Sequence, residues 1–186
     1  MSQPLLVIFL GSIGVGKSYF ARQLAPRLDA VRLNGDAARV ALYGSRDALP
    51  TKNGPEGEAN NLKMYGVLDY TVREILSSGK SVVYDTARFN GTQNRQTIRT
   101  LADEVGARLV IVRIDTPREV AHHRVMTREE TDDQRKMSDE RAQEIFQFHD
   151  TNTVDPDPSE RVITIDGQAP FDEQFASFEQ QLYSEK

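Results

Sequence analysis

Short apolar segments alternate with longer amphipathic segments along this chain. The short segments are rich in Val, Ile and Leu and are bounded by Gly, Asp or Pro, which is typical of buried strands. They are Leu5–Leu10, Ala30–Leu33, Ser81–Asp85, Arg108–Ile114 and Arg161–Ile165. The longer segments have apolar residues at helical spacing and predict helices at Lys17–Leu28, Ala37–Tyr43, Glu56–Ser78, Thr92–Val105, Pro117–Arg128, Ser138–Asp150 and Phe171–Tyr183. This alternation predicts an α/β fold in which helices cover both faces of a parallel sheet.

The length of 186 residues indicates one domain, residues 1–186. Two stretches interrupt the regular alternation. Gly44–Gly57 is rich in Gly and Pro, and we expect a long loop near a functional site. Glu129–Met137 is a dense run of charges between two predicted helices.

Composition excludes several classes of protein. The chain has no cysteine, which removes disulfides, thiolate zinc sites and cysteine nucleophiles and fits a reducing compartment. The longest apolar run, Leu5–Leu10, is far shorter than the roughly 20 residues of a membrane-spanning helix. It also lacks the basic flank and cleavage site of a signal peptide. The net charge of −5 argues against passive coating of nucleic acid. We therefore expect a cytoplasmic protein without membrane attachment.

A phosphate-binding pattern, G-x-x-x-x-G-K-[ST], lies between the first predicted strand and the first predicted helix. Its residues are Gly11, Ser12, Ile13, Gly14, Val15, Gly16, Lys17 and Ser18. Glycines allow successive backbone N–H groups to point at an anion, and the start of the helix adds a partial positive charge. Lys17 is then expected to reach the β- and γ-phosphates, and Ser18 to ligate Mg²⁺. We add the next residue, Tyr19, to the nucleotide-binding candidates.

The end of the third predicted strand carries a second magnesium candidate, Asp85. A carboxylate at this edge of a parallel sheet lies near the phosphate loop, although Asp also commonly begins surface loops. The next residue is Thr86, where ATPases that hydrolyse with an activated water usually carry Glu. The guanine-binding pattern N-K-x-D is absent from the sequence. Phosphoryl transfer to an acceptor other than water is therefore favoured.

The second strand leads into a further candidate site at Asp36 and Arg39. Asp36 could accept the proton of an acceptor hydroxyl, as a general base does. Arg39, three residues later on the same helical face, could hold an anionic acceptor or orient Asp36. The alternative is that Asp36 only caps the helix, because Asp is a preferred N-cap residue. The two interpretations are equally compatible with the local sequence, and the expected position at the sheet edge favours the base.

Arginines near the charged run form a third candidate group. Arg124 and Arg128 are spaced i, i+4 and so project from one helical face, and Arg135 and Lys136 follow. Arginine suits phosphate oxygens and can neutralise charge that develops during transfer. The alternative is a solvated basic face that is paired with the acidic residues around it.

The three histidines and four of the aromatic residues are assigned no chemistry from the sequence. The histidines, His122, His123 and His149, have no partner at metal-ligand spacing. The aromatic residues Tyr65, Tyr70, Phe146 and Phe148 are expected to pack in the core or on helix faces.

Together these segments resemble the P-loop kinases that are grouped with polynucleotide kinases, zeta toxins and chloramphenicol phosphotransferase. The resemblance rests on the phosphate loop, on LNGDAAR (residues 33–39), on GKSVVYDTARFN (residues 79–90) and on Arg124–Arg128, and it continues more loosely through RVITIDGQAPFDEQ (residues 161–174). It implies strand order 2-3-1-4-5 and a small helical lid at about residues 124–140.

The resemblance also implies roles for individual residues. It implies that Asp36 is the general base and that Arg39 contacts the acceptor. It also implies that Asp85 faces the phosphate and magnesium region and that Arg128 belongs to the lid. Many relatives read Asp-Ala-Thr-Asn where this chain has Asp85-Thr86-Ala87-Arg88. Arg88 is therefore a candidate acceptor contact, and the identity of the acceptor stays open.

These observations predict a kinase that uses ATP and Mg²⁺ to phosphorylate a hydroxyl of a small molecule. A polynucleotide 5′-hydroxyl kinase would need a basic channel, for which the candidates are Arg39, Arg88 and Arg95. Because the chain is acidic, we expect a small acceptor between Asp36, Arg39 and the Gly44–Gly57 loop. A further alternative is a P-loop ATPase or nucleotide-dependent switch that is not a kinase.

Overall fold

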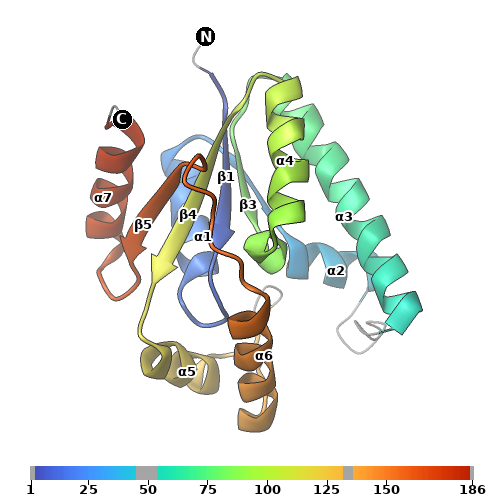
Figure 1. The fold of residues 1–186 in the computed structure, drawn as a ribbon, viewed down its shortest axis with the longest axis vertical. Helices are drawn as coiled ribbons and strands as arrows, with labels where there is room; N and C mark the ends of the chain where they lie inside the picture. The colour runs from blue at the N-terminus through green and yellow to red at the C-terminus, as the bar shows by residue number, and fades with distance from the viewer. Residues whose placement is uncertain (1–2, 45–53, 132–135, 185–186) are drawn as a thin grey trace.

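The computed structural model describes residues 3–44, 54–131 and 136–184. Its centre is a five-stranded parallel sheet with the order β2-β3-β1-β4-β5 (Figure 1). The strands are β1 (Leu5–Leu10), β2 (Val31–Asn34), β3 (Val82–Asp85), β4 (Arg108–Asp115) and β5 (Val162–Asp166). The predicted α/β class and strand order are confirmed, and the arrangement is that of a P-loop NTPase.

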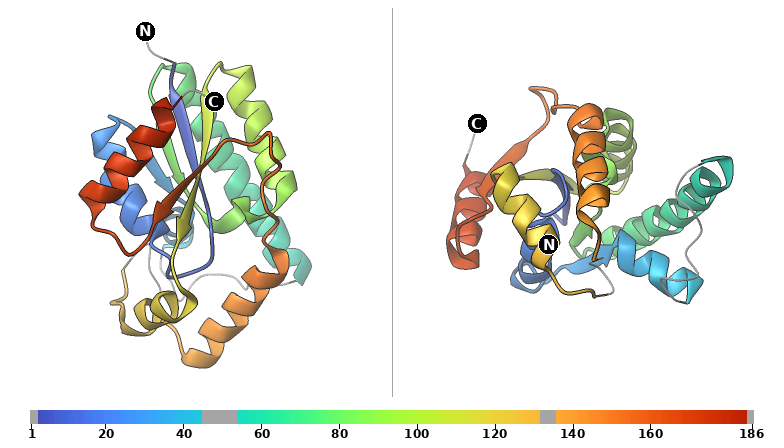
Figure 2. Two further views of the ribbon diagram at one scale, coloured as in Figure 1. Left: turned by 60° about the vertical axis from the view of Figure 1, so that its left-hand side comes forward. Right: turned by 90° about the horizontal axis from the view of Figure 1, so that it is seen from below.

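Helices cover both faces of the sheet and also its carboxyl edge. They are α1 (Lys17–Arg27), α2 (Gly35–Tyr43), α3 (Gly54–Ser77), the 3₁₀ helix η1 (Ala87–Asn90), α4 (Thr92–Glu104), α5 (Arg118–Thr127), α6 (Asp139–Asn152) and α7 (Phe171–Tyr183). Helices α1 and α7 pack on one face, and α3 and α4 pack on the other. Helices α5 and α6 pack together beyond the carboxyl ends of the strands (Figures 1 and 2). No helix within the described ranges is long and apolar enough to cross a membrane.

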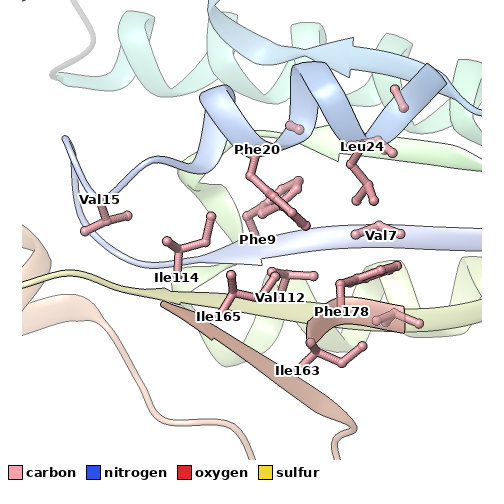
Figure 3. Packing of buried hydrophobic residues seen from close by; sticks show 14 of the residues in the cluster. Val7, Phe9, Val15, Phe20, Leu24, Val112, Ile114, Ile163, Ile165 and Phe178 are labelled. Atoms are coloured by element: carbon pink, nitrogen blue, oxygen red, sulfur yellow. The ribbon is translucent and has the colours of Figure 1, made fainter. Parts of the chain in front are cut away.

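Strand β1 explains why the core has two halves. Its alternate side chains point to opposite faces, so that Val7 and Phe9 join the cluster under α1 and α7, and Leu6 and Ile8 join the cluster under α3 and α4. The Phe20 ring of α1 contacts Phe9 with a centroid distance of 6.5 Å (Figure 3). Because β1 is buried on both faces, the phosphate loop that follows it begins from a rigid support.

Predicted and observed bounds of the predicted elements differ by at most two residues, and the earlier start of α2 has a clear physical cause. Helix α2 begins at Gly35 because Asn34 caps it, with Asn34 Oδ1 accepting a hydrogen bond from Ala37 N at 2.7 Å. Residues 54–57 of the predicted loop Gly44–Gly57 belong instead to α3, which begins at Gly54. Residues 45–53 of that predicted loop lie outside the described residues.

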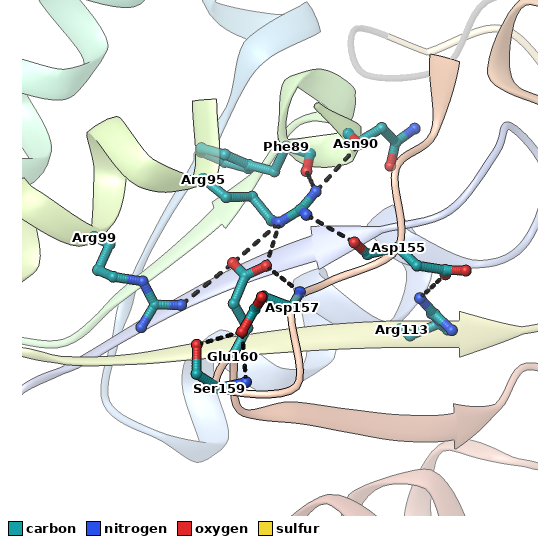
Figure 4. A network of polar contacts seen from close by, with 9 residues as sticks. All are labelled: Phe89, Asn90, Arg95, Arg99, Arg113, Asp155, Asp157, Ser159 and Glu160. Atoms are coloured by element: carbon teal, nitrogen blue, oxygen red, sulfur yellow. Dashed lines mark hydrogen bonds and ion pairs between the residues drawn. The ribbon is translucent and has the colours of Figure 1, made fainter. Parts of the chain in front are cut away.

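A fully buried arginine, Arg95 of α4, connects η1 to the segment between α6 and β5 (Figure 4). Its Nε donates to Glu160 Oε1 at 3.1 Å, and its Nη1 donates to the carbonyls of Phe89 and Asn90 at 3.1 and 3.2 Å. Its Nη2 donates to the carbonyl of Asp155 at 3.3 Å. The expectation that Arg95 could line a basic channel is therefore wrong, because its guanidinium is buried and hydrogen-bonded to other residues of the protein.

We expect Arg95→Ala to lower the free energy of unfolding by roughly 3–5 kcal/mol, because it leaves Glu160 and three carbonyls without their buried donor. Chemical denaturation measures this loss. The matched control is Arg99→Ala, since the Arg99 side chain pairs with the same Glu160 carboxylate but is 38% exposed. That control should cost less than about 1 kcal/mol. Equal losses in the two variants would contradict a structural role specific to Arg95.

Candidate active site

A cavity of about 1130 Å³ opens at the carboxyl edge of the sheet. It is lined by the phosphate loop and by residues of α2, α3, α5, α6, the end of β3 and the turn between β5 and α7. The sequence candidates on its wall are Ile13, Gly14, Gly16, Lys17, Ser18, Tyr19, Asp36, Asp85, Arg124 and Arg128. The fold thus collects most of the predicted site residues in one space.

The phosphate loop depends on its glycines for two separate reasons. Gly11, Gly14 and Gly16 all have positive φ, at 122°, 75° and 113°, which other residues rarely adopt. A Cβ at Gly14 would also lie 2.2 Å from the carbonyl oxygen of Ala121 in α5. Val15 anchors the loop, because its side chain is buried in the core (Figure 3) and its carbonyl accepts from Thr116 Oγ1 at 2.8 Å.

Lys17 begins α1 at the base of the cavity. Its Nζ donates to the carbonyl of Gly11 at 2.8 Å and also to that of Ser12. Burial lowers the pKa of the Lys17 ammonium from 10.5 to about 8, and the nearby carboxylates of Asp85 and Asp36 oppose this effect. The amine is therefore held among loop carbonyls with two acidic groups close enough to influence it.

Ser18 and Asp85 form the candidate magnesium site. Ser18 Oγ donates to Asp85 Oδ1 at 3.1 Å, and Asp85 Oδ2 accepts from Arg32 Nη2 at 2.5 Å and from Asn34 Nδ2 at 2.8 Å. Asp85 is buried, so the alternative of a surface Asp that begins a loop is wrong. Hydroxyl and carboxylate oxygens fit Mg²⁺, which usually takes its remaining ligands from phosphates and water. Accordingly, the described residues contain no group of three or more His, Cys, Asp or Glu that could hold a metal by themselves.

Asp36 lies in the first turn of α2 and faces the cavity. Because Asn34 provides the cap, the alternative that Asp36 is the N-cap is wrong. Arg39, one turn later, is buried and is not among the residues on the cavity wall. Its Nε has no hydrogen-bond partner within the described part of the chain. The predicted contact between Arg39 and the acceptor thus has no support from the geometry.

Arg88 has a structural position instead of the predicted place in the acceptor site. Its Nη1 and Nη2 donate to the two carboxylate oxygens of Asp69 in α3 at 3.0 and 2.9 Å. Its guanidinium lies 4.7 Å from the centroid of the Tyr65 ring. This side chain is 8% exposed and is absent from the cavity wall, so Arg88 fastens α3 to the end of β3.

The two arginines of the predicted lid lie together, as their i, i+4 spacing predicts. Arg124 and Arg128 both line the cavity, and Arg124 Nη2 donates to the carbonyl of Gly167 at 3.0 Å. Gly167 itself is packed so closely that a Cβ would lie 1.9 Å from Thr116 Oγ1. Helix α5, the β5–α7 turn and the phosphate loop therefore form one continuous wall. The predicted candidate Arg135 lies outside the described residues.

Comparison with known proteins agrees with this geometry. The family described as AAA domain matches residues 6–149, which include the phosphate loop, Asp36, Asp85, Arg124 and Arg128. The chain belongs to the AAA domain family. No curated protein matches it.

Solved structures place this AAA domain among folds of kinases. An unliganded sugar kinase from Janibacter sp. HTCC2649 is 17% identical, with coverage of 97% of this chain and 95% of that chain and a TM-score of 0.65. A gluconokinase from Sinorhizobium meliloti 1021 is 18% identical, with coverage of 97% and 91% and a TM-score of 0.61. The APS kinase CysC of Mycobacterium tuberculosis, in complex with AMPPNP and APS, is 22% identical, with coverage of 99% and 100% and a TM-score of 0.66. The AAA domain therefore has a kinase-like P-loop fold.

The AAA domain also brings to the cavity residues that the sequence analysis left without a role. Asn61 and Tyr65 of α3 line it one turn apart, and Tyr65 Oη lies 3.1 Å from Thr86 Oγ1. Phe148 of α6 was expected to pack, but it is 62% exposed and borders the cavity. His149, next to it, also lines the wall. The spacing of Asn61 and Tyr65 was visible in the sequence, but only the packed structure shows which face of α3 meets the sheet edge.

Proposed function

We propose that this AAA domain is an ATP- and Mg²⁺-dependent kinase that transfers the γ-phosphoryl group of ATP to a hydroxyl of a small molecule. One observation carries the proposal. Lys17 and Ser18 of the phosphate loop share a single cavity with the carboxylate of Asp36. That cavity is large compared with the roughly 300–1,000 Å³ of ordinary ligand pockets, so it has room for a nucleotide and an acceptor together.

The nucleotide would lie along the phosphate loop. Backbone N–H groups of the loop and the start of α1 favour the phosphate charge, and the Lys17 ammonium would leave its loop carbonyls to bind β- and γ-oxygens. Arg124 and Arg128 approach from the lid side of the cavity and would neutralise charge on the transferring group. Mg²⁺, held at Ser18 Oγ and Asp85 Oδ1, would neutralise charge on the phosphates when bound. Tyr19, half exposed at the cavity mouth, is available for the rest of the nucleotide.

The acceptor would lie on the side of Asp36, Asn61, Tyr65 and Thr86. In the transfer step, the acceptor oxygen forms a bond to the γ-phosphorus, and the bond from that phosphorus to the oxygen bridging it to the β-phosphate breaks. The hydroxyl proton passes to the Asp36 carboxylate, and ADP leaves. The cap of α2 comes from Asn34 and not from Asp36, so proton transfer to the Asp36 carboxylate would leave the helix cap in place.

Burial of the basic residues supports a small acceptor over a polynucleotide. The three candidates for a basic channel, Arg39, Arg88 and Arg95, are all buried, and the last two are held by internal partners. A strand of nucleic acid needs exposed cations along its phosphates. Within the described residues, these three positions do not provide such a channel.

The test measures transfer from γ-labelled ATP to a metabolite pool and to a 5′-hydroxyl oligonucleotide, each at low and moderate salt. We expect label in a small molecule with weak dependence on salt. Oligonucleotide labelling that falls steeply with salt would replace the small acceptor with a polynucleotide, because counterion release makes such binding salt-dependent. ATP turnover at the same rate without any acceptor would instead indicate a hydrolase or switch.

A further inference from the structure

His149, near the end of α6, is tied to the first residue of the phosphate loop through Asn90. Its Nδ1 lies 2.9 Å from Asn90 Nδ2. The same Asn90 amide accepts from Gly11 N at 3.0 Å and donates to Gly11 O at 3.3 Å. Asn90 is 5% exposed, so these bonds are formed away from solvent. The imidazole ring therefore has a fixed position relative to the loop.

The hydrogen bonds also assign the tautomer of His149. The Asn90 oxygen must face the Gly11 N–H, because the flipped amide would place its NH₂ group against that donor. Asn90 Nδ2 is then a donor, and His149 Nδ1 is its acceptor without a proton. Burial and the nearby Lys17 lower the pKa of His149 to about 4, so that the ring is neutral at pH 7. Its single N–H is on Nε2.

The Nε2–H group of His149 has no hydrogen-bond partner within the described residues, although its ring borders the cavity. The ring also belongs to a continuous chain of contacts with the phosphate-binding amine. Lys17 Nζ donates to Gly11 O at 2.8 Å, Asn90 donates to the same oxygen, and Asn90 donates to His149. The unused donor thus comes from helix α6, beyond the carboxyl ends of the strands, whereas Lys17 comes from helix α1 on the sheet (Figures 1 and 2).

We propose that His149 is a further catalytic residue, whose Nε2–H donates a hydrogen bond to the transferring phosphoryl group. This inference rests on the proposed kinase function. Lys17, Arg124 and Arg128 already bring positive charge to the cavity, and a neutral donor adds a directed hydrogen bond without further repulsion among them. The donor is fixed in advance by Asn90, so that it needs little reorganisation when charge develops on the phosphoryl oxygens.

Two substitutions separate the two ring nitrogens. His149→Asn retains an oxygen near the Nδ1 position that can accept from Asn90, but it has no donor at the Nε2 position. His149→Gln can place an N–H near the Nε2 position, but it loses the acceptor for Asn90. The probes are MgADP alone and MgADP with aluminium fluoride, which mimics the transferring phosphoryl group without requiring the acceptor.

We expect the wild-type protein to bind MgADP more tightly when aluminium fluoride is present. His149→Asn should reduce this preference by roughly ten- to a hundredfold, within the cost of removing one transition-state donor, while the affinity for MgADP alone and the melting temperature stay the same. His149→Gln should retain part of the preference. The control is His123→Asn, because His123 is an exposed histidine on α5.

The result that overturns the inference is an aluminium fluoride preference of the same size in wild-type protein and in His149→Asn, whatever that size is. A His149→Asn protein that loses stability and MgADP affinity together would also overturn it, because His149 would then have only a structural role. Failure of the wild-type protein to bind MgADP is a different outcome, since it contradicts the proposed kinase function itself.

Discussion

The variant Asp36→Asn should lower kcat by roughly 10²–10⁴-fold, the range typical for loss of a general base. The amide cannot take the acceptor proton, yet it has nearly the same shape as the carboxylate. The fold should be almost unaffected, because Asn34 and not Asp36 caps α2. The lost carboxylate near the start of the helix should cost no more than about 1 kcal/mol.

Steady-state transfer kinetics and thermal unfolding measure the two expectations for Asp36. The matched control is Glu119→Gln, which makes the same change from carboxylate to amide at an exposed position in the first turn of α5. It should leave kcat unchanged. If Asp36→Asn also retains the wild-type kcat, Asp36 is not the base.

The variant Lys17→Ala should lower transfer by at least roughly 10²–10³-fold, because it removes a positive donor aimed at the phosphates. The free energy of unfolding should stay the same or rise slightly. Burial disfavours the Lys17 ammonium and lowers its pKa, so the substitution removes an unfavourable burial that offsets the lost hydrogen bonds to the Gly11 and Ser12 carbonyls. Retained turnover with the acceptor would contradict the assignment of Lys17.

A pH series gives this assignment a second measurement. With a pKa of about 8 in the folded protein, Lys17 is charged at pH 7 and mostly neutral at pH 9. Binding of ATP phosphates favours the ammonium, so ATP binding above pH 8 requires proton uptake and its affinity should fall. The free energy of unfolding should instead rise as the pH increases from about 8 to 10.5. In that range the unfolded chain still binds the Lys17 proton that the folded chain has lost. Calorimetry should show no such fall in ATP affinity in Lys17→Ala.

Local pattern in the sequence determined the elements and the phosphate loop. Each strand is a short apolar run between turn residues, and each helix has its own apolar face. Both kinds of element can therefore be predicted from residues that are close together in the sequence. The loop could be predicted for the same reason, since its function depends on successive backbone groups, on Lys17 and on Ser18 within one short segment. The strand order came from the resemblance to a family, and the structure confirms it.

Only the tertiary structure decided which polar residues face the cavity. Arg88 and Asp36 both lie just after a strand, but only Asp36 lines the cavity. Arg88 is paired with Asp69 outside the cavity wall, whereas Asn34 takes the position of helix cap that Asp36 could have filled. The sequence assigned no chemistry to His149, because its partner Asn90 is 59 residues away along the chain. Spacing within one element shows which residues share a face, but the partner that neutralises or orients a side chain comes from another element, and only packing brings the two together.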